Sequence, residues 1–223
     1  MRKLILSILM ALTTLAGMAC TSVIISGRRT ASGKPIIFKN RDTDCLDNRL
    51  QWFEAGDMRF VGIVNAPIED GEVWSGSNSA GFSIINTADY NFNEDSTYAD
   101  YQKRILAIER EGGDASALRA KMNAFSSEWL QDTRKIQMDR EGELMYKALR
   151  VCKTVEDFLH LLDTLPKPLG VEANFGVVDA EGGAMYVETN NWRYVTYDVN
   201  AIPEGYKVQT NYAFAGNEFD RMG

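Results

Sequence analysis

The sequence predicts an α+β fold in which helices pack on antiparallel sheet. Three observations support this: β-branched apolar runs near the start of the chain, a long helical region between about residues 97 and 165, and strand-forming segments after it. Strands, then helices, then strands favour segregated layers over alternating βαβ units. The chain has 223 residues and shows neither repeats nor a low-complexity linker, so we expect one domain.

The first two strands are expected at residues 21–26 (TSVIIS) and 35–40 (PIIFKN), which are rich in β-branched residues. The segment between them has glycine near both ends, and this combination is typical of a β-hairpin. The same reasoning predicts further strands at residues 58–66, 81–86, 174–178, 185–188, 194–197 and 206–212.

The helical region divides into four segments. The first is charged and amphipathic, begins near Thr97 and closes on Gly112 and Gly113, a usual way for a helix to end. In the last segment, Thr154 and Asp157 have the spacing of a capping box. The three helices after the first are expected at residues 115–137, 141–151 and 154–165.

Residues 1–19 have the pattern of a secretory signal peptide, because Arg2 and Lys3 precede a short apolar stretch that ends in small residues. This stretch is too short to predict a stable membrane span, and no later stretch has the roughly 20 apolar residues that a membrane helix needs. We therefore predict export to the periplasm or the extracellular space, with residues 20–223 as the mature domain.

The composition argues against several function classes. A net charge of −7 with no basic cluster disfavours nucleic acid as a partner. The single histidine, His160, lies in an apolar helical pattern, which disfavours a Ser-His-Asp triad or a histidine-rich metal site. The three cysteines Cys20, Cys45 and Cys152 do not make the disulfide framework of a small secreted domain. We expect no metal and no cofactor. The composition leaves open whether the protein forms a homo-oligomer.

The functional interpretation depends on Cys20. Three roles are open: a lipid anchor, an ordinary core cysteine, or a nucleophile exposed when the leader is removed. A lipobox has an aliphatic residue three positions before the cysteine and small residues between, so Gly17 and Met18 fit it poorly. Small side chains at Gly17 and Ala19 suit ordinary signal peptidase instead. This favours a free N-terminal cysteine over a lipoprotein.

The segments after Cys20 resemble the N-terminal nucleophile (Ntn) hydrolases, above all the choloylglycine hydrolases, penicillin V acylases and acyl-CoA:6-aminopenicillanic acid acyltransferases. Cys20-Thr21 resembles the start of their mature chain, and residues 39–42 (KNRD) resemble their basic-Asn-x-Asp element, with lysine where relatives often have arginine. Residues 78–86 (NSAGFSIIN) and 208–211 (VQTN) resemble two later family strands that end in an asparagine. These segments occur in the family order.

The resemblance implies a four-layer αββα sandwich of two antiparallel sheets. Relatives continue beyond the segment similar to residues 208–211 with more strands, another helix and a late arginine, so the resemblance implies that the C-terminal part of the fold is missing here. It also implies five site residues. Their roles are nucleophile (Cys20), stabilisation of the thiolate by charge (Lys39), a partner of the α-amino group (Asp42), an oxyanion donor (Asn86) and orientation of amine and substrate (Asn211).

This chemistry needs no histidine. A free α-amino group has a pKa of about 7.7–8.0, so it can take the proton of a thiol on the same residue and later return it to a leaving amine. The predicted activity is hydrolysis of a linear amide C–N bond in a small N-acyl compound, through a thioester. Acyl transfer through the same thioester is the alternative among enzymes. A non-catalytic surface lipoprotein, acylated at Cys20, is the alternative outside enzymes.

Overall fold

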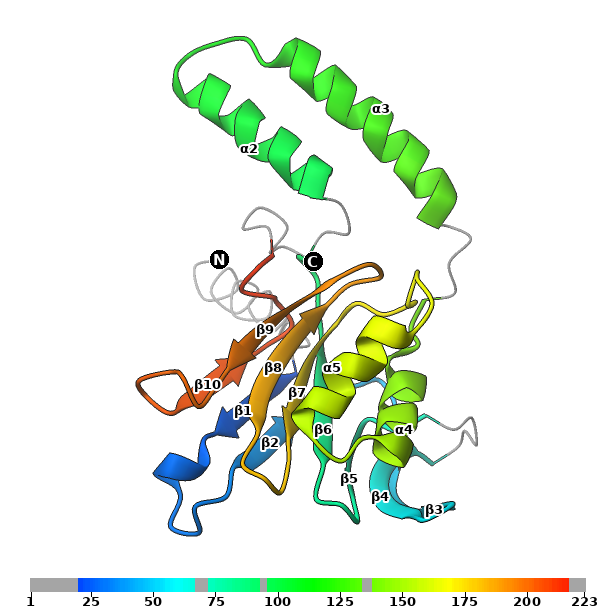
Figure 1. Cartoon of the computed structure of the whole chain (residues 1–223). Coiled ribbons are helices and arrows are strands. Elements are labelled where there is room, and N and C mark those ends of the chain that lie inside the picture. The colour runs from blue at the N-terminus through cyan, green and yellow to red at the C-terminus, as the bar shows by residue number, and fades with distance from the viewer. Residues whose placement is uncertain (1–19, 67–71, 93–95, 134–137, 217–223) are drawn as a thin grey trace, which may run out of the picture.

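The computed structural model describes residues 20–66, 72–92, 96–133 and 138–216. The predicted signal peptide and residues 134–137, the end of the second expected helix, lie outside these ranges. Two antiparallel sheets, one of three strands and one of seven, form the centre of the molecule (Figure 1). This arrangement confirms the predicted α+β class with two antiparallel sheets.

The small sheet has the order β10-β1-β2. Strand β1 (Thr21–Ile25) lies in the middle and pairs with β2 (Ile36–Asn40) and β10 (Tyr206–Gln209). The short 3-10 helix η1 (Gly27–Arg29) lies in the connection from β1 to β2, which form the predicted hairpin.

The large sheet follows the chain order from β3 to β9, and every neighbouring pair is antiparallel. Its strands are β3 (Asn48–Ala55), β4 (Met58–Asn65), β5 (Ser75–Asn78), β6 (Ser83–Ala88), β7 (Ala173–Val178), β8 (Ala184–Thr189) and β9 (Tyr194–Asp198).

Four helices separate β6 from β7. Helices α4 (Glu141–Val151) and α5 (Val155–Thr164) cover one face of the large sheet, and the small sheet contacts the opposite face (Figure 1). Helices α2 (Ser96–Arg110) and α3 (Ser116–Thr133) pack on each other as a hairpin that stands away from both sheets (Figure 1). The predicted capping box is present at the start of α5, so that prediction is confirmed.

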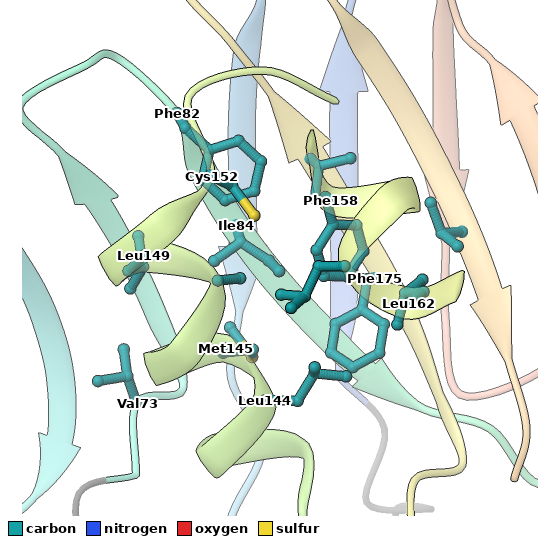
Figure 2. Packing of buried hydrophobic residues seen from close by; sticks show 14 of the residues in the cluster. Val73, Phe82, Ile84, Leu144, Met145, Leu149, Cys152, Phe158, Leu162 and Phe175 are labelled. Atoms are coloured by element: carbon teal, nitrogen blue, oxygen red, sulfur yellow. The ribbon is translucent and has the colours of Figure 1, made fainter. Parts of the chain in front are cut away.

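The main hydrophobic core lies between the large sheet and α4 and α5. Figure 2 shows Phe158 of α5 near Phe175 of β7, and their ring centroids are 5.6 Å apart in an edge-to-face arrangement. Met145, Leu149 and Cys152 contribute from the other helix and its end, and all three are fully buried. Burial raises the pKa of the Cys152 thiol to about 12, so this cysteine is an inert core residue.

Two strands were not expected from the sequence. β3 mixes charged with apolar residues, and β5 (SGSN) contains no β-branched or aromatic residue. β5 forms because β4 and β6 pair with it on both sides. Its Gly76 lies under α4, where an added Cβ would come within 2.6 Å of a methyl carbon of Leu149. Tertiary packing, and not local propensity, therefore selects this segment.

The described residues form three of the four predicted layers: helices, large sheet and small sheet. They place no helix over the outer face of the small sheet, where four large side chains are exposed: Ile36, Phe38, Tyr206 and Val208. In the described part of the chain, no helix is long and apolar enough to span a bilayer, and no group of three or more potential ligands is arranged for a metal. Cys20, Cys45 and Cys152 are all free, and His160 is exposed.

Candidate active site

The residues around β1 direct Cys20 towards the large sheet. Ser22 and Ile24 are both fully buried, and the Tyr186 hydroxyl of β8 donates a hydrogen bond to the Ser22 hydroxyl (3.0 Å). Because side chains alternate along a strand, Cys20 points to the same side as Ser22. The candidate nucleophile therefore faces the space between the two sheets.

The register of the small sheet gives Cys20 its neighbours. Lys39 of β2 and Gln209 of β10 lie opposite the same residue of β1, one on each side. Arg41 follows the end of β2, and Asn211 lies two residues beyond the end of β10. Residues from three distant parts of the sequence thus reach one end of the small sheet.

The sulfur of Cys20 contacts the backbone of Asp42. The Asp42 N–H lies 3.4 Å from Sγ in donor geometry, and Sγ lies 3.5 Å from the Asp42 carbonyl oxygen. The Asp42 backbone offers the sulfur one donor and one acceptor. Asp42 is therefore next to Cys20, as expected, and its backbone makes this contact.

Lys39 links the two sheets. Its ammonium group donates to the Asn86 side-chain oxygen (2.7 Å) and to the Trp74 carbonyl oxygen (3.0 Å). Burial lowers the pKa of Lys39 to about 8; a negative charge on Cys20 opposes this effect, and the charge of Arg41 adds to it. Lys39 is thus a partly buried cation whose pKa depends on the charge state of the candidate nucleophile.

Lys39 fixes the orientation of the Asn86 amide. An ammonium group can only donate, so Oδ1 of Asn86 must face it and the amide nitrogen Nδ2 must point elsewhere. Asn86 is buried, and none of the described residues accepts a hydrogen bond from Nδ2. Along β6 it shares a side with Ile84 of the main core, whereas Ile85 and Thr87 face the small sheet. Lys39 contacts the Asn86 amide next to Trp74, the residue that directly precedes β5.

Asn211 is held by the segment that follows β6. The Tyr90 N–H donates to the Asn211 carbonyl (3.0 Å), and the Asn211 side-chain amide lies 3.4 Å from the Tyr90 hydroxyl. Next to it, the Thr87 hydroxyl donates to the Thr210 carbonyl (2.6 Å). β10 ends at Gln209, earlier than the expected strand, and Asn211 is buried in the segment that follows.

Asn174 of β7 is a polar residue at this site that the sequence did not single out. It is fully buried, and its amide nitrogen donates to the Thr210 carbonyl (3.2 Å) and the Ala88 carbonyl (3.0 Å). Its side-chain oxygen accepts no hydrogen bond from the described residues. A buried polar atom without a hydrogen bond lowers the stability of the fold, so its presence calls for an explanation such as a functional role. An asparagine inside an otherwise apolar strand (ANFGVV) is the sequence signal that identifies it.

The structure thus brings together two pairs of the five predicted residues, Cys20 with Asp42 and Lys39 with Asn86. Asn211 lies beyond the end of β10, where its side-chain amide contacts the Tyr90 hydroxyl. A pocket of about 290 Å³ opens beside them and is lined by Lys39, among other residues.

No protein-family model matches the sequence, and a search of curated proteins finds no match. Among solved structures, the Caenorhabditis elegans ortholog of N-acylethanolamine-hydrolyzing acid amidase aligns over 91% of this chain and 74% of its own, with 15% identity and a TM-score of 0.53. Penicillin V acylase from Agrobacterium tumefaciens aligns over 81% of this chain and 41% of its own, with 10% identity and a TM-score of 0.34. A variant of conjugated bile acid hydrolase from Clostridium perfringens aligns over 86% and 45%, with 10% identity and a TM-score of 0.34.

The likeness to the C. elegans protein shows that this chain has the Ntn-hydrolase fold. It confirms the resemblance that the ordered sequence segments indicated. At 15% identity the shared property is the fold. The chain spans less than half the length of the other two structures.

Proposed function

We propose that this protein hydrolyses linear amide C–N bonds in small N-acyl compounds, with Cys20 as an N-terminal nucleophile. The observation that carries the proposal is the position of Cys20. It directly follows the predicted cleavage site and directly precedes β1, the central strand of the small sheet. Its side chain faces the large sheet near the partly buried Lys39. The protein from C. elegans with the same fold is an amidase, which supports this reaction class.

Removal of residues 1–19 during export would activate the site, because in the full chain the Cys20 nitrogen is part of the peptide bond to Ala19. Once free, the α-amino group takes the thiol proton, and the thiolate attacks the amide carbonyl carbon. The charge of Lys39 stabilises the thiolate before the attack. Below pH about 8 Lys39 keeps this charge.

The attack turns the carbonyl oxygen into an oxyanion, which needs fixed donors. The amide nitrogen of Asn86 is the proposed donor, since Lys39 holds the opposite end of that amide. The protonated α-amino group then gives its proton to the leaving nitrogen, the C–N bond breaks and a thioester remains on Cys20. Asn211, which is buried just beyond the end of β10, orients the α-amino group and the substrate.

Water completes the reaction. The α-amino group, neutral again, takes a proton from water, and the hydroxide formed adds to the thioester carbon. The C–S bond breaks, the carboxylic acid leaves and the thiol is regenerated. If an amine attacks in place of water, the same intermediate gives acyl transfer. The ratio of free acid to new amide in the products separates the two outcomes.

The proposal is tested on the exported protein. N-terminal sequencing and intact mass should give Cys20 as the first residue with a free amine. Amine release should be measured with an N-acylethanolamine, a conjugated bile acid, penicillin V and N-acyl amino acids. Cys20→Ser should lower hydrolysis by at least about 1,000-fold, because the serine hydroxyl is a weaker nucleophile at this pH.

Cys45→Ser is the matched control, since Cys45 is also free and partly exposed. It should keep activity near that of the unaltered protein. A diacylglycerol mass on Cys20 would instead identify a lipoprotein, and equal rates in both variants would exclude Cys20 as the nucleophile.

A further inference from the structure

The pocket beside Lys39 lies in the angle between β2 and the large sheet. Ile37 of β2 forms one wall, and Val61, Ile63 and Ile85 form the floor on the large sheet. Two positively charged side chains, Lys39 and Arg41, line the same pocket. It therefore combines an apolar body with a cationic end.

Arg41 is held in place before any ligand binds. Its two terminal nitrogens donate to the side-chain oxygens of Asn48 and Asn65, and the latter bond measures 2.9 Å. Its guanidinium carbon lies 5.1 Å from the centroid of the Trp74 ring, a cation–π distance. A guanidinium has five N–H donors, and the two asparagines use two of them. Three N–H donors therefore remain for another acceptor, and Arg41 lines the pocket.

The charges around this pocket do not balance within the described residues. Neither Lys39 nor Arg41 forms an ion pair with a described carboxylate, although the whole chain carries a net charge of −7. Burial lowers the pKa of both groups, which means that keeping them charged costs free energy. A thiolate on Cys20 offsets one positive charge, and one remains.

We propose that this pocket binds a carboxylate of the substrate, so that the enzyme acts on anionic N-acyl compounds. The carboxylate pairs with the free donors of Arg41, and the apolar part of the substrate lies against Ile37, Val61 and Ile63. Arg41 is then the residue that determines specificity. The inference that the ligand is a substrate rests on the proposed hydrolase function. The inference that the ligand is an anion rests on the pocket alone.

The carboxylate can belong to the acyl group or to the leaving amine, and two matched pairs of substrates separate these cases. Glutaryl-p-nitroanilide and its methyl ester differ in charge on the acyl side. N-hexanoylglycine and N-hexanoylglycinamide differ in charge on the amine side. In one pair, the charged member should have a kcat/KM about 10- to 100-fold above that of the neutral member, as expected for charge-assisted hydrogen bonds.

Arg41→Met should reduce this preference to within about threefold, and Arg41→Lys should restore part of it because the charge returns without the planar fork. Arg28→Met is the control: it removes the same charge from an exposed position of η1, at the opposite end of β1 from Cys20. It should keep the preference, which excludes an effect of net charge.

Calorimetric titration of the Cys20→Ser protein with the same four compounds makes the test independent of catalysis. Tighter binding of a charged compound than of its neutral partner, abolished by Arg41→Met in the same background, supports the pocket even if nothing is hydrolysed. Equal binding within both pairs, or binding of no compound, overturns the inference even if neutral amides are cleaved.

Discussion

The two faces of the large sheet are built from the same strands but have different contents. Towards α4 and α5, β7 presents Phe175 and Val177 to the main core. Towards the small sheet, the same strand presents Asn174 and Gly176, where an added Cβ would lie 3.0 Å from Ile85. A strand with both faces buried can thus contribute to the hydrophobic core with one face and to the candidate site with the other.

The two faces also differ in how burial is stabilised. On the helix side, burial of aromatic and aliphatic side chains is favourable by itself, at about 25 cal/mol per Å² of apolar surface. Between the sheets the apolar cluster is smaller, and polar groups must be paired. The Gln209 amide, for example, donates to the buried Glu188 carboxylate (3.1 Å). The site face therefore contributes less to stability and more to the arrangement of the reactive groups.

The largest expected effect on this comparison comes from the helix side. Phe158→Ala removes a fully buried ring that contacts Phe82 and Phe175. It should lower the free energy of unfolding by about 3–5 kcal/mol, measured by urea denaturation. The kcat of the fraction that stays folded should change less than threefold, because Phe158 lies on the face away from Cys20. A kcat loss that exceeds the loss of folded protein would show that the two faces are coupled.

The next effect concerns the candidate site, where Lys39 of the small sheet contacts the Asn86 amide. Asn86→Ala should lower kcat by about 100-fold, as expected for loss of one oxyanion donor. Asn86→Asp keeps the size and the contact with Lys39 but has no N–H to donate, so it should lose as much. Both should be measured under saturating substrate.

Asn78 provides the matched control. It is also a buried asparagine in a strand of the large sheet, but it donates to the Leu149 and Cys152 carbonyls at the end of α4. Asn78→Ala should lower the melting temperature and leave the kcat of the folded enzyme near its original value. If Asn86→Ala behaves like Asn78→Ala, the amide of Asn86 is structural and the oxyanion donor lies elsewhere, with Asn174 as the next candidate.

The sequence predicts the helix side of this comparison better than the site side. The capping box at Thr154 and the 3.6-residue pattern of α5 are local signals, so they predict the element and its buried face. β5 has no such signal, because its pairing depends on β4 and β6. The roles of Asn174 and Arg41 depend on contacts with residues that are far away in the chain. A single sequence does not show which distant residues are in contact. Local patterns alone do not indicate that Cys20 and Lys39 belong to one site. The order of the segments that resemble the family indicates it.

The last effect is a pH dependence at the edge of the site face. Asp89 follows β6, is almost fully buried, and burial raises its pKa to about 7. Its Oδ1 accepts the N–H groups of Asn91 and Phe92. Since the pKa in the folded state lies above the unfolded value of 3.8, the folded state binds more protons between these two values. The free energy of unfolding must therefore fall as the pH rises through this window.

Asp89→Asn removes this ionisation and keeps an oxygen for both backbone N–H groups. The variant should match the unaltered protein at pH 4 and become more stable by about 3–4 kcal/mol at pH 8, measured by urea denaturation at both values. Asp114→Asn is the control with the opposite sign. Asp114 is exposed, and the Ser116 N–H that it accepts lowers its pKa, so its charge favours the folded state above pH about 4. Asp114→Asn should therefore gain nothing at pH 8. An equal gain in both variants would trace the effect to net charge, whereas a gain at Asp89 alone identifies a buried carboxylate that the segment holding Asn211 tolerates at a cost in stability.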